Sequence, residues 1–369
     1  MKLQPKLKQI NYLFTLLIAL LAVVISFAGC KKTGTSDLIS FDVENTKGVT
    51  VDFDDVFEID RILVLEETDV SLVSHIIKVE CYNNDFYISD NRHGIVLRFD
   101  ENGKFLNKIG SEGNGPGEIA RLSSFEINEK HICLLDYMKV VKYKLDGTFI
   151  EEFDKRYFTI DFDFRDSEYF FYNINVPSYD QFIISDSLHS VIKSFSPLRD
   201  GPLVMGLLGR DYLIYNQGKY YFTYPYSDTI YLLNDTISEA FLSYGFGISK
   251  FTDFPGLLNR TADINLSEIS YSFKDFMTDD YIISSLVLNG QKGLLIYDRE
   301  SRNSMLIDSI AGGPDLMNNS SLQDITDDGI MCWSYNPIKK NETYDKILRG
   351  INTNNNDLLI LTKLKKSKI

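Results

Sequence analysis

The most reactive side chains of this sequence gather in one short segment. Asp90, Arg92 and His93 place a carboxylate, a guanidinium and an imidazole close together in the chain. Such a set could hold a divalent cation or a polar ligand. The chain has four histidines and carries neither an HExxH nor a GxSxG motif, the signatures of zinc proteases and serine hydrolases. The sequence therefore predicts no catalytic residue, and we treat these three side chains as candidate ligand-binding residues.

A second aspartate repeats the position of the first. Asp136 follows Asp90 by 46 residues, and Gly147 follows Gly103 by 44. Each aspartate ends an apolar run, and each glycine lies in a turn that also contains aspartate. A period of 40 to 50 residues with about four short strands per repeat is typical of a β-propeller blade. Asp136 therefore joins the candidate ligand-binding residues.

The elements that must position these residues are short apolar runs bounded by Asn, Asp and Gly, which predict hairpin-connected antiparallel strands. The 25 Phe and 22 Tyr favour the pleated, half-buried surfaces of such strands. We predict an all-β fold, a six-bladed β-propeller of four-stranded antiparallel blades, in which an N-terminal strand at 62–66 completes the last blade. The predicted blades are 76–110, 122–153, 160–195, 211–244, 270–307, and 322–335 with 358–362.

Tyrosines concentrate in the fourth predicted blade, where five lie between residues 220 and 231. Exposed tyrosines are good platforms for sugars or peptides, whereas alternation along a strand buries about half of them between blades. Tyr224 and Tyr226 are the candidate ligand-binding residues of this group. An insertion at 249–276 then interrupts the repeat. Because insertions on a repeat scaffold gather on one face, this segment is the candidate contact with a partner.

Two further motifs have a structural and a functional interpretation. Residues 113–118 contain the glycine spacing of a nucleotide-binding loop, but no helix pattern follows. We therefore predict a blade-to-blade crossover that needs positive φ angles. Asp161 and Asp163 alternate with phenylalanines and could ligate Ca²⁺. Because no calcium-loop signature follows, we predict a solvated strand face instead.

The N-terminal segment resembles a bacterial lipoprotein signal. Lysines precede an apolar run at residues 12–28, and Cys30 follows a pair of small residues. The alternative is an uncleaved membrane anchor, for which the apolar run is short. We predict a signal peptide at 1–29, a tether at 30–54 that is lipidated at Cys30, and a propeller at 55–369.

Charge and cysteine content limit the remaining function classes. The net charge of −14 argues against nucleic-acid binding, which needs basic patches. Cys81, Cys133 and Cys332 remain after Cys30, and no CxxC motif occurs. The sequence therefore predicts buried free thiols rather than a disulfide framework or a zinc site.

Several motifs, in this order along the chain, carry a resemblance to a known family. The Gly-x-Gly-Pro-Gly-Glu segment at 113–118 is similar to NHL-type propeller repeats. The segments 227–231 (SDTIY), 312–315 (GGPD) and 357–360 (DLLI) resemble those of six-bladed β-propeller lipoproteins of Gram-negative envelopes. The resemblance implies a propeller in the cell envelope. Lys31 and Lys32 directly follow Cys30 and provide no acidic surface-export signal, so we predict a lipid anchor in the outer membrane that faces the periplasm. It supplies no catalytic residues.

The predicted function is a binding module for an envelope protein, peptide or glycan, attached to the membrane through its lipid and requiring no cofactor. The alternative is a metal-dependent hydrolase or lyase with its site in the central channel. Such an enzyme needs ligands from several blades, and Asp90 and Asp136 are the one matching pair that the sequence offers. Aspartates at strand ends more often cap a turn, which favours the binding module.

Overall fold

The computed structural model describes most of the chain from residue 38 onward. The described residues are 38–73, 76–90, 94–136, 138–155, 157–173, 178, 180–197, 211–224, 226–247, 250, 268–314, 316, 320–335 and 358–365. The signal peptide, Cys30, Arg92, His93 and residues 251–267 of the predicted insertion lie outside them. Residues 40–369 form one compact unit.

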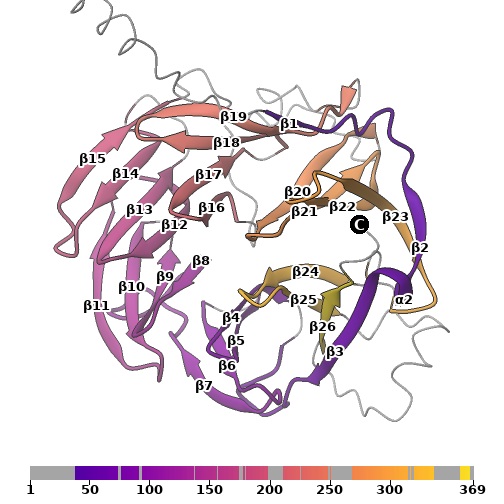
Figure 1. Ribbon diagram of the computed structural model, residues 1–369. Coiled ribbons are helices and arrows are strands. Elements are labelled where there is room, and N and C mark those ends of the chain that lie inside the picture. Colours follow the sequence, from indigo (N-terminus) through magenta and orange to yellow (C-terminus); the bar gives the residue numbers. More distant parts are fainter. Residues whose placement is uncertain are drawn as a thin grey trace, which may run out of the picture. The chain divides into compact units, whose positions relative to one another are not determined.

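The described strands of this unit form six sheets arranged in a ring, which confirms the predicted six-bladed β-propeller (Figure 1). Each blade has four antiparallel strands. In blades 1 to 5 the first of these strands along the chain lies innermost. Blade 6 takes its outermost strand from the N-terminal region, and its other three strands follow in chain order from the inside outward. Blade 1 contains β4 (Ile76–Tyr82), β5 (Asp85–Asp90), β6 (Val96–Phe99) and β7 (Phe105–Ile109); blade 2 contains β8 (Leu122–Ile127), β9 (His131–Asp136), β10 (Lys139–Lys144) and β11 (Phe149–Asp154); blade 3 contains β12 (Thr159–Arg165), β13 (Glu168–Asn173), β14 (Phe182–Ser185) and β15 (Val191–Phe195). Blade 4 contains β16 (Leu213–Asn216), β17 (Lys219–Thr223), β18 (Thr229–Asn234) and β19 (Ile237–Ser243); blade 5 contains β20 (Tyr271–Met277), β21 (Tyr281–Leu288), β22 (Gln291–Asp298) and β23 (Ser304–Ala311); blade 6 contains β24 (Ser320–Ile325), β25 (Ile330–Tyr335), β26 (Leu358–Leu364) and β3 (Phe57–Val64).

The ring closes in blade 6, where the N-terminal strand β3 pairs antiparallel with the C-terminal strand β26. Phe57 is fully buried and packs edge-on against Trp333, with the ring centroids 6.3 Å apart. The indole N–H of Trp333 donates to Thr362 at 2.9 Å. The predicted closing strand is therefore confirmed, and it begins earlier than the predicted residues 62–66.

The segment before β3 differs from the predicted tether. After β1 (Ile39–Ser40), the N–H of Phe41 donates to the carbonyl of Ser243 on the outer edge of blade 4. β2 (Val49–Asp52) then pairs in parallel with β23 of blade 5, and the one-turn helix α2 (Phe53–Val56) leads into β3. Phe41 and Phe53 are buried. Residues 41–54 therefore cover the outer edges of two blades, which edge strands require if they are to avoid pairing with other chains.

The crossover from blade 1 to blade 2 has the positive φ angles that its glycines predicted. Gly117 has a φ of +69°, and a Cβ at this position would lie 2.9 Å from the ring of Phe149. Its N–H donates to Glu152 at 2.9 Å, while Glu118 accepts from the N–H of Gly115 at 2.8 Å. The N–H groups of Gly115 and Gly117 thus donate to carboxylates of the protein itself, as expected of a connection between blades.

The innermost strands share an irregularity. In every blade except the fourth, the register of the inner strand shifts by one residue near its start, which is the mark of a β-bulge. The first residues after these shifts are Lys78, Ser124, Asp161, Lys274 and Asp324. Polar side chains thus stand at equivalent positions in five of the six inner strands.

Candidate functional site

The two aspartates predicted to match each other do occupy equivalent positions. Asp90 ends β5 and pairs with Ile76, the first residue of the inner strand β4. Asp136 ends β9 and pairs with Leu122, the first residue of the inner strand β8. Both side chains are buried. The carboxylate of Asp136 accepts from the backbone N–H of Ala120 at 2.9 Å and so holds the crossover that leads into β8. A role for either aspartate in ligand binding stays a prediction.

The two candidate tyrosines have different environments. Tyr224 is buried, and its hydroxyl accepts a hydrogen bond from the side-chain amide of Gln181 at 2.8 Å. Tyr226 is half-buried in the left-handed region, at a φ of +61°. Its ring meets that of Tyr271 edge-on, with centroids 5.0 Å apart. Of the two, Tyr226 is therefore the one near the surface, beside the first residue of β20.

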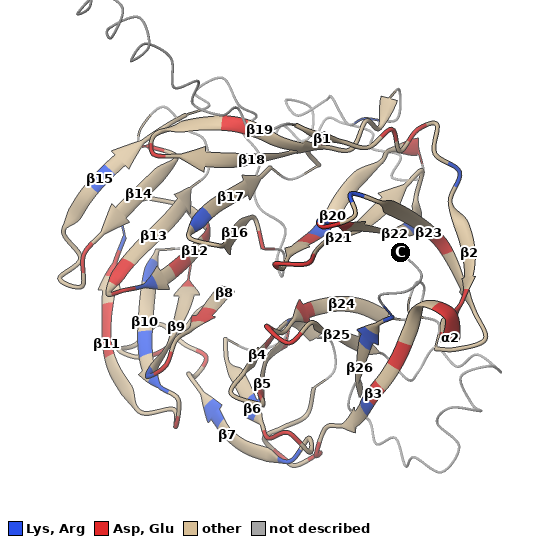
Figure 2. Ribbon diagram, in the orientation of Figure 1, with Lys and Arg blue, Asp and Glu red and all other residues tan. Residues whose placement is uncertain are grey.

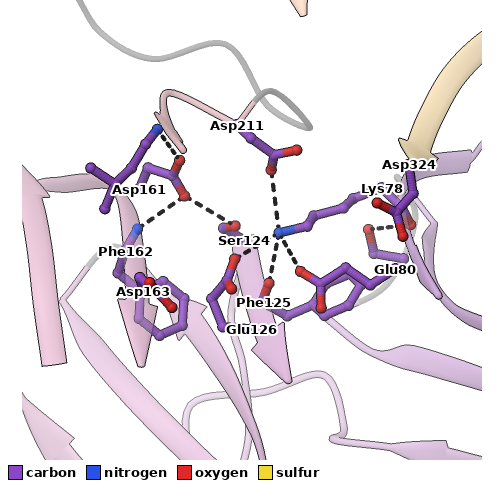
Figure 3. A network of polar contacts seen from close by, with 12 residues as sticks. Lys78, Glu80, Ser124, Phe125, Glu126, Asp161, Phe162, Asp163, Asp211 and Asp324 are labelled. Atoms are coloured by element: carbon purple, nitrogen blue, oxygen red, sulfur yellow. Dashed lines mark hydrogen bonds and ion pairs between the residues drawn. The ribbon is translucent and has the colours of Figure 1, made fainter. Parts of the chain in front are cut away.

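Charged residues also gather on the innermost strands around the centre of the ring, where Figure 2 shows Lys, Asp and Glu on the strands of several blades. Lys78 of β4 lies at the middle of this group and is almost fully buried. Its ammonium group lies 2.7 Å from Glu80, 2.9 Å from Glu126 and 3.2 Å from Asp211, and it donates to the carbonyl of Phe125 at 2.8 Å (Figure 3). One lysine therefore joins blades 1, 2 and 4.

A second buried lysine extends the group. Lys274 of β20 lies 2.9 Å from the other carboxylate oxygen of Asp211, and it donates to the carbonyl of Gln323 at 2.7 Å. Asp211 thus lies between two ammonium groups. Burial alone would raise its pKa, but Lys274 and Lys78 outweigh that effect and hold the pKa well below its usual range. Asp211 is therefore ionised, and it joins blade 4 to blades 1 and 5.

Backbone N–H groups complete the ring of contacts. Asp161 of blade 3 accepts from Tyr212 at 2.7 Å and from Leu213 at 2.9 Å, at the start of blade 4. Ser124 of blade 2 reaches Asp161 at 3.5 Å. Asp324 of blade 6 accepts from the N–H of Cys81 in blade 1 at 2.7 Å. Each blade is therefore linked to both its neighbours, and we call this set of residues the axial network. Its charged and hydroxyl members are Lys78, Glu80, Ser124, Glu126, Asp161, Asp211, Lys274 and Asp324.

The axial network holds more carboxylates than ammonium groups, and burial shifts the pKa values of several of these carboxyl groups. Burial is the main cause that raises the pKa of Glu80 to about 7, against the opposing effect of Lys78. Burial, together with Asp211, raises the pKa of Asp161 to about 7. The pKa values of Glu126 and Asp324 are raised for the same first reason. Several of these carboxyl groups are therefore neutral at mildly acidic pH.

The prediction of a solvated face for Asp161 and Asp163 was wrong. Both side chains are buried, because an inner strand of a propeller is covered on each side by a neighbouring blade. Asp163 pairs with Arg165 at 2.6 Å. In the described part of the chain, no group of three or more His, Cys, Asp or Glu side chains is arranged to hold a metal ion. Lysine ammonium groups and backbone N–H groups take the places around these carboxylates instead.

Sequence reasoning also missed Lys78, Asp211 and Lys274. The available signal was weak: Lys78 stands among apolar residues and Lys274 directly follows Phe273, each near the start of a predicted inner strand. Two such lysines in different repeats indicate buried partners, because a lysine is rarely fully buried unless it is paired.

A cavity of about 230 Å³ lies between blades 5 and 6, near the starts of their inner strands. Tyr271 and Phe273 of β20 contribute aromatic walls, and Ser320, Ser321 and Lys292 contribute polar groups. Tyr226 contacts Tyr271 from blade 4. Asp90 and Asp136 lie at the corresponding end of their own blades, as the register shows. We call this cavity the blade 5–6 pocket.

A second cavity of about 260 Å³ lies at the opposite end of blades 5 and 6. Its rim consists largely of turn residues, among them Asp279, Asp327 and Asp328, with Lys363 beside them. Tyr281 is the aromatic residue that lines it, whereas Tyr271, Phe273 and Trp333 line the blade 5–6 pocket. An acidic rim of turn residues is ordinary for a chain with this excess of acid, so this cavity is the weaker candidate.

Comparison with known proteins gives the family and the fold. A family model described as "Domain of unknown function (DUF4934)" matches residues 38–363, and the chain belongs to that family. No curated protein matches the sequence. A Bacteroides fragilis protein predicted to be exported has a solved structure that is 20% identical, with a TM-score of 0.67 over 89% of this chain and 99% of the other. This likeness shows the propeller fold.

Two other solved structures are more distant. A streptogramin B lyase is 10% identical, with a TM-score of 0.46 over 89% of this chain and 96% of its own. The Pan2 WD40 domain of Neurospora crassa is 9% identical, with a TM-score of 0.45 over 87% of this chain and 99% of its own. Neither carries an argument about function. Among the described residues, no helix is long and apolar enough to cross a membrane.

Proposed function

We propose that this propeller is a ligand-binding module of the cell envelope and that it holds a glycan or peptide group in the blade 5–6 pocket. The observation that carries the proposal is the contrast between two polar regions. The carboxylates of the axial network are hydrogen-bonded or ion-paired by the protein itself. In the blade 5–6 pocket Lys292 also donates to the protein, to the carbonyl of Ser320 at 3.0 Å, but aromatic rings and the hydroxyl of Ser321 border open space.

The chemistry of the pocket fits sugars and peptides. The rings of Tyr271 and Phe273 can stack on the apolar face of a sugar or on a peptide side chain. Ser321 and Lys292 supply donors that fix the orientation of a polar ligand. Pockets for drug-sized molecules measure roughly 300–1,000 Å³. The smaller volume here suits one sugar residue or one side chain of a longer ligand.

The proposed location is the periplasmic side of the outer membrane, through a lipid on Cys30. Two things support it: the lipoprotein-like pattern of residues 1–30, and the predicted export of the Bacteroides fragilis relative. The test is labelling of the full chain with a radioactive fatty acid in a bacterial host. We expect label in the wild-type protein and none in Cys30→Ala. Equal labelling of both would remove the proposed anchor.

The binding function is tested by a thermal-shift screen of the full chain against envelope glycans, short peptides and divalent cations. A ligand at 100 times its Kd stabilises the fold by about 2.7 kcal/mol, which raises the melting temperature by roughly 4 °C in a domain of this size. A glycan or peptide that gives this shift supports the proposal. A shift with a divalent cation alone would favour the metal-dependent hydrolase or lyase.

Variants locate the site. Tyr271→Ala should cut the ligand-induced shift to about half or less, because it removes an aromatic wall of the blade 5–6 pocket and so weakens binding. Tyr215→Ala is the matched control, since this tyrosine is also on an inner strand but does not line the pocket. If Tyr271→Ala keeps the full shift, the ligand binds elsewhere on the protein.

A further inference from the structure

Cys81 and Cys332 meet at the joint between the first and the last blade. Cys81 lies on β4 of blade 1, and Cys332 lies on β25 of blade 6. In the β24–β25 register Cys332 is directly opposite Asp324. The carboxylate of Asp324 accepts the N–H of Cys81 at 2.7 Å. Asp324 therefore relates the two cysteines: it accepts a hydrogen bond from the backbone of Cys81 and lies opposite Cys332 on the neighbouring strand.

Alternation along both strands turns the two thiols toward each other. Lys78 points into the axial network, so Cys81, which is an odd number of positions away, faces the other side of β4. There it packs with Val79 and Cys332 in one hydrophobic cluster. On β25, Trp333 packs in the cluster on the opposite side of the sheet, which leaves Cys332 facing blade 1. A direct interaction between the two thiols, together with burial, raises the pKa of the Cys81 thiol.

We propose that Cys81 and Cys332 form a disulfide bond in the mature protein. The structure holds both as free thiols, in contact across the joint. The bond would enclose almost the whole propeller in one loop, and long loops give the largest stabilisation in the chain-entropy model. It would join blade 1 to blade 6 covalently and so add to the β3–β26 pairing, which closes the ring within blade 6. An oxidising compartment outside the cytoplasm is where such a bond persists.

The oxidation needs a disulfide-bearing partner, such as an envelope thiol oxidoreductase or glutathione disulfide. The thiolate of Cys81, the more exposed of the two, attacks the oxidant's disulfide and forms a mixed disulfide, releasing one thiol. Cys332 then attacks the sulfur of Cys81 and releases the second thiol. Two protein S–H bonds are lost and one S–S bond forms, while two electrons and two protons reduce the oxidant. Because the folded environment disfavours the Cys81 thiolate, the bond should form mainly during folding.

The test compares the full chain exported to the envelope of a bacterial host with the same chain retained in its cytoplasm. Free thiols are blocked with N-ethylmaleimide in denaturant before digestion without reductant. We expect a linked peptide pair containing Cys81 and Cys332 in the exported protein, which reduction separates. Cys133, which packs against blade 3, should carry the blocking group in both samples. Exported, folded protein with both Cys81 and Cys332 blocked would overturn the proposal.

Stability measurements give a second readout. Reductant should lower the melting temperature of the exported wild type by an amount on the order of 5 °C. It should leave Cys81→Ala and Cys332→Ala unchanged, and the double variant should melt close to each single variant because the two side chains act as one unit. Cys133→Ala is the matched control and should remain sensitive to reductant. Equal sensitivity of Cys81→Ala and wild type would contradict the bond.

Discussion

The axial network and the blade 5–6 pocket lie in one propeller, yet they differ in whether their side chains border open space. In the axial network, Lys78 has three carboxylates and one carbonyl within 3.2 Å, all from the protein. In the pocket, the polar groups border open space of about 230 Å³. Removing one partner from the axial network leaves a buried charge that has neither its ion pair nor water around it. Changing the pocket should, under the proposed function, alter ligand binding instead.

This difference bears on whether a cluster of buried charged residues is a catalytic site or a structural ion-pair network. Buried ionisable groups with shifted pKa values often mark catalytic sites, but networks of structural ion pairs shift pKa values as well. In this propeller the charged groups join every blade to its neighbours, which a purely catalytic cluster would not need to do. We therefore propose that the centre of the ring serves stability and that the blade 5–6 pocket serves recognition.

The largest expected effect is that of removing the central ammonium group. Lys78→Met should lower the free energy of unfolding by about 3–5 kcal/mol, because it leaves Glu126 and Asp211 short of a buried partner. Urea denaturation measures the loss. The matched control is Lys193→Met, since Lys193 pairs with Asp235 on the surface and both side chains are exposed. We expect a change of about 0–1 kcal/mol there.

A small effect of Lys78→Met would erase the distinction between the two regions. If the loss is no greater than that of Lys193→Met, the axial network does not hold the blades together. The centre of the ring would then again be a candidate functional site, as the alternative of a metal-dependent enzyme in the central channel requires.

The strands could be predicted from the sequence because their signals are local. The predicted first blade, 76–110, agrees with β4 to β7 almost to the residue, since apolar alternation and Asn/Asp/Gly turns mark each hairpin. The edge-covering segment 41–54 was missed. β2 is mostly exposed, and its partner strand β23 lies more than 250 residues later in the chain. Neither hydrophobic periodicity nor a turn signal therefore predicts β2.

The candidate site could be predicted much less well, for a physical reason. The partners in the axial network come from different blades, so their contacts depend on how the ring closes rather than on sequence spacing. The alternation of Asp161 with phenylalanine was read correctly as one strand face, but the sequence does not say that a neighbouring blade covers that face. The same holds for Tyr271, whose pocket exists because blade 6 lies beside it.

An intermediate effect is expected from pH. The pKa of Glu80 is raised from 4.5 to about 7, so the folded protein binds an extra proton between these values. Stability from this group is fully present below pH 4.5 and is lost as the pH rises through 7. The free energy of unfolding should therefore fall by at least about 1 kcal/mol between pH 5 and 7.5. Glu80→Gln, which cannot ionise, should flatten this slope.

Asp161 should add to the same slope, since burial also raises its pKa, from 3.8 to about 7. Asp211 acts in the opposite sense, because its lowered pKa makes stability fall in strong acid. The resulting maximum lies at mildly acidic pH. A wild-type protein whose stability rises steadily from pH 5 to 7.5 would contradict the protonated state assigned to the axial carboxyl groups.

The smallest effect on stability is expected in the blade 5–6 pocket. Tyr271 is half-buried at the start of β20, with space on one side. Tyr271→Ala should therefore cost less than large-to-small changes in a closed core, about 1–2 kcal/mol. The same change should weaken binding of the identified glycan or peptide at least tenfold, as calorimetry would measure. Lys78→Met should show the reverse pattern, with a large loss of stability and little change in affinity at temperatures where it remains folded. These opposite effects of the two variants would distinguish the structural role of the axial network from ligand binding in the blade 5–6 pocket. A general loss of folding would instead lower both stability and ligand affinity in both variants.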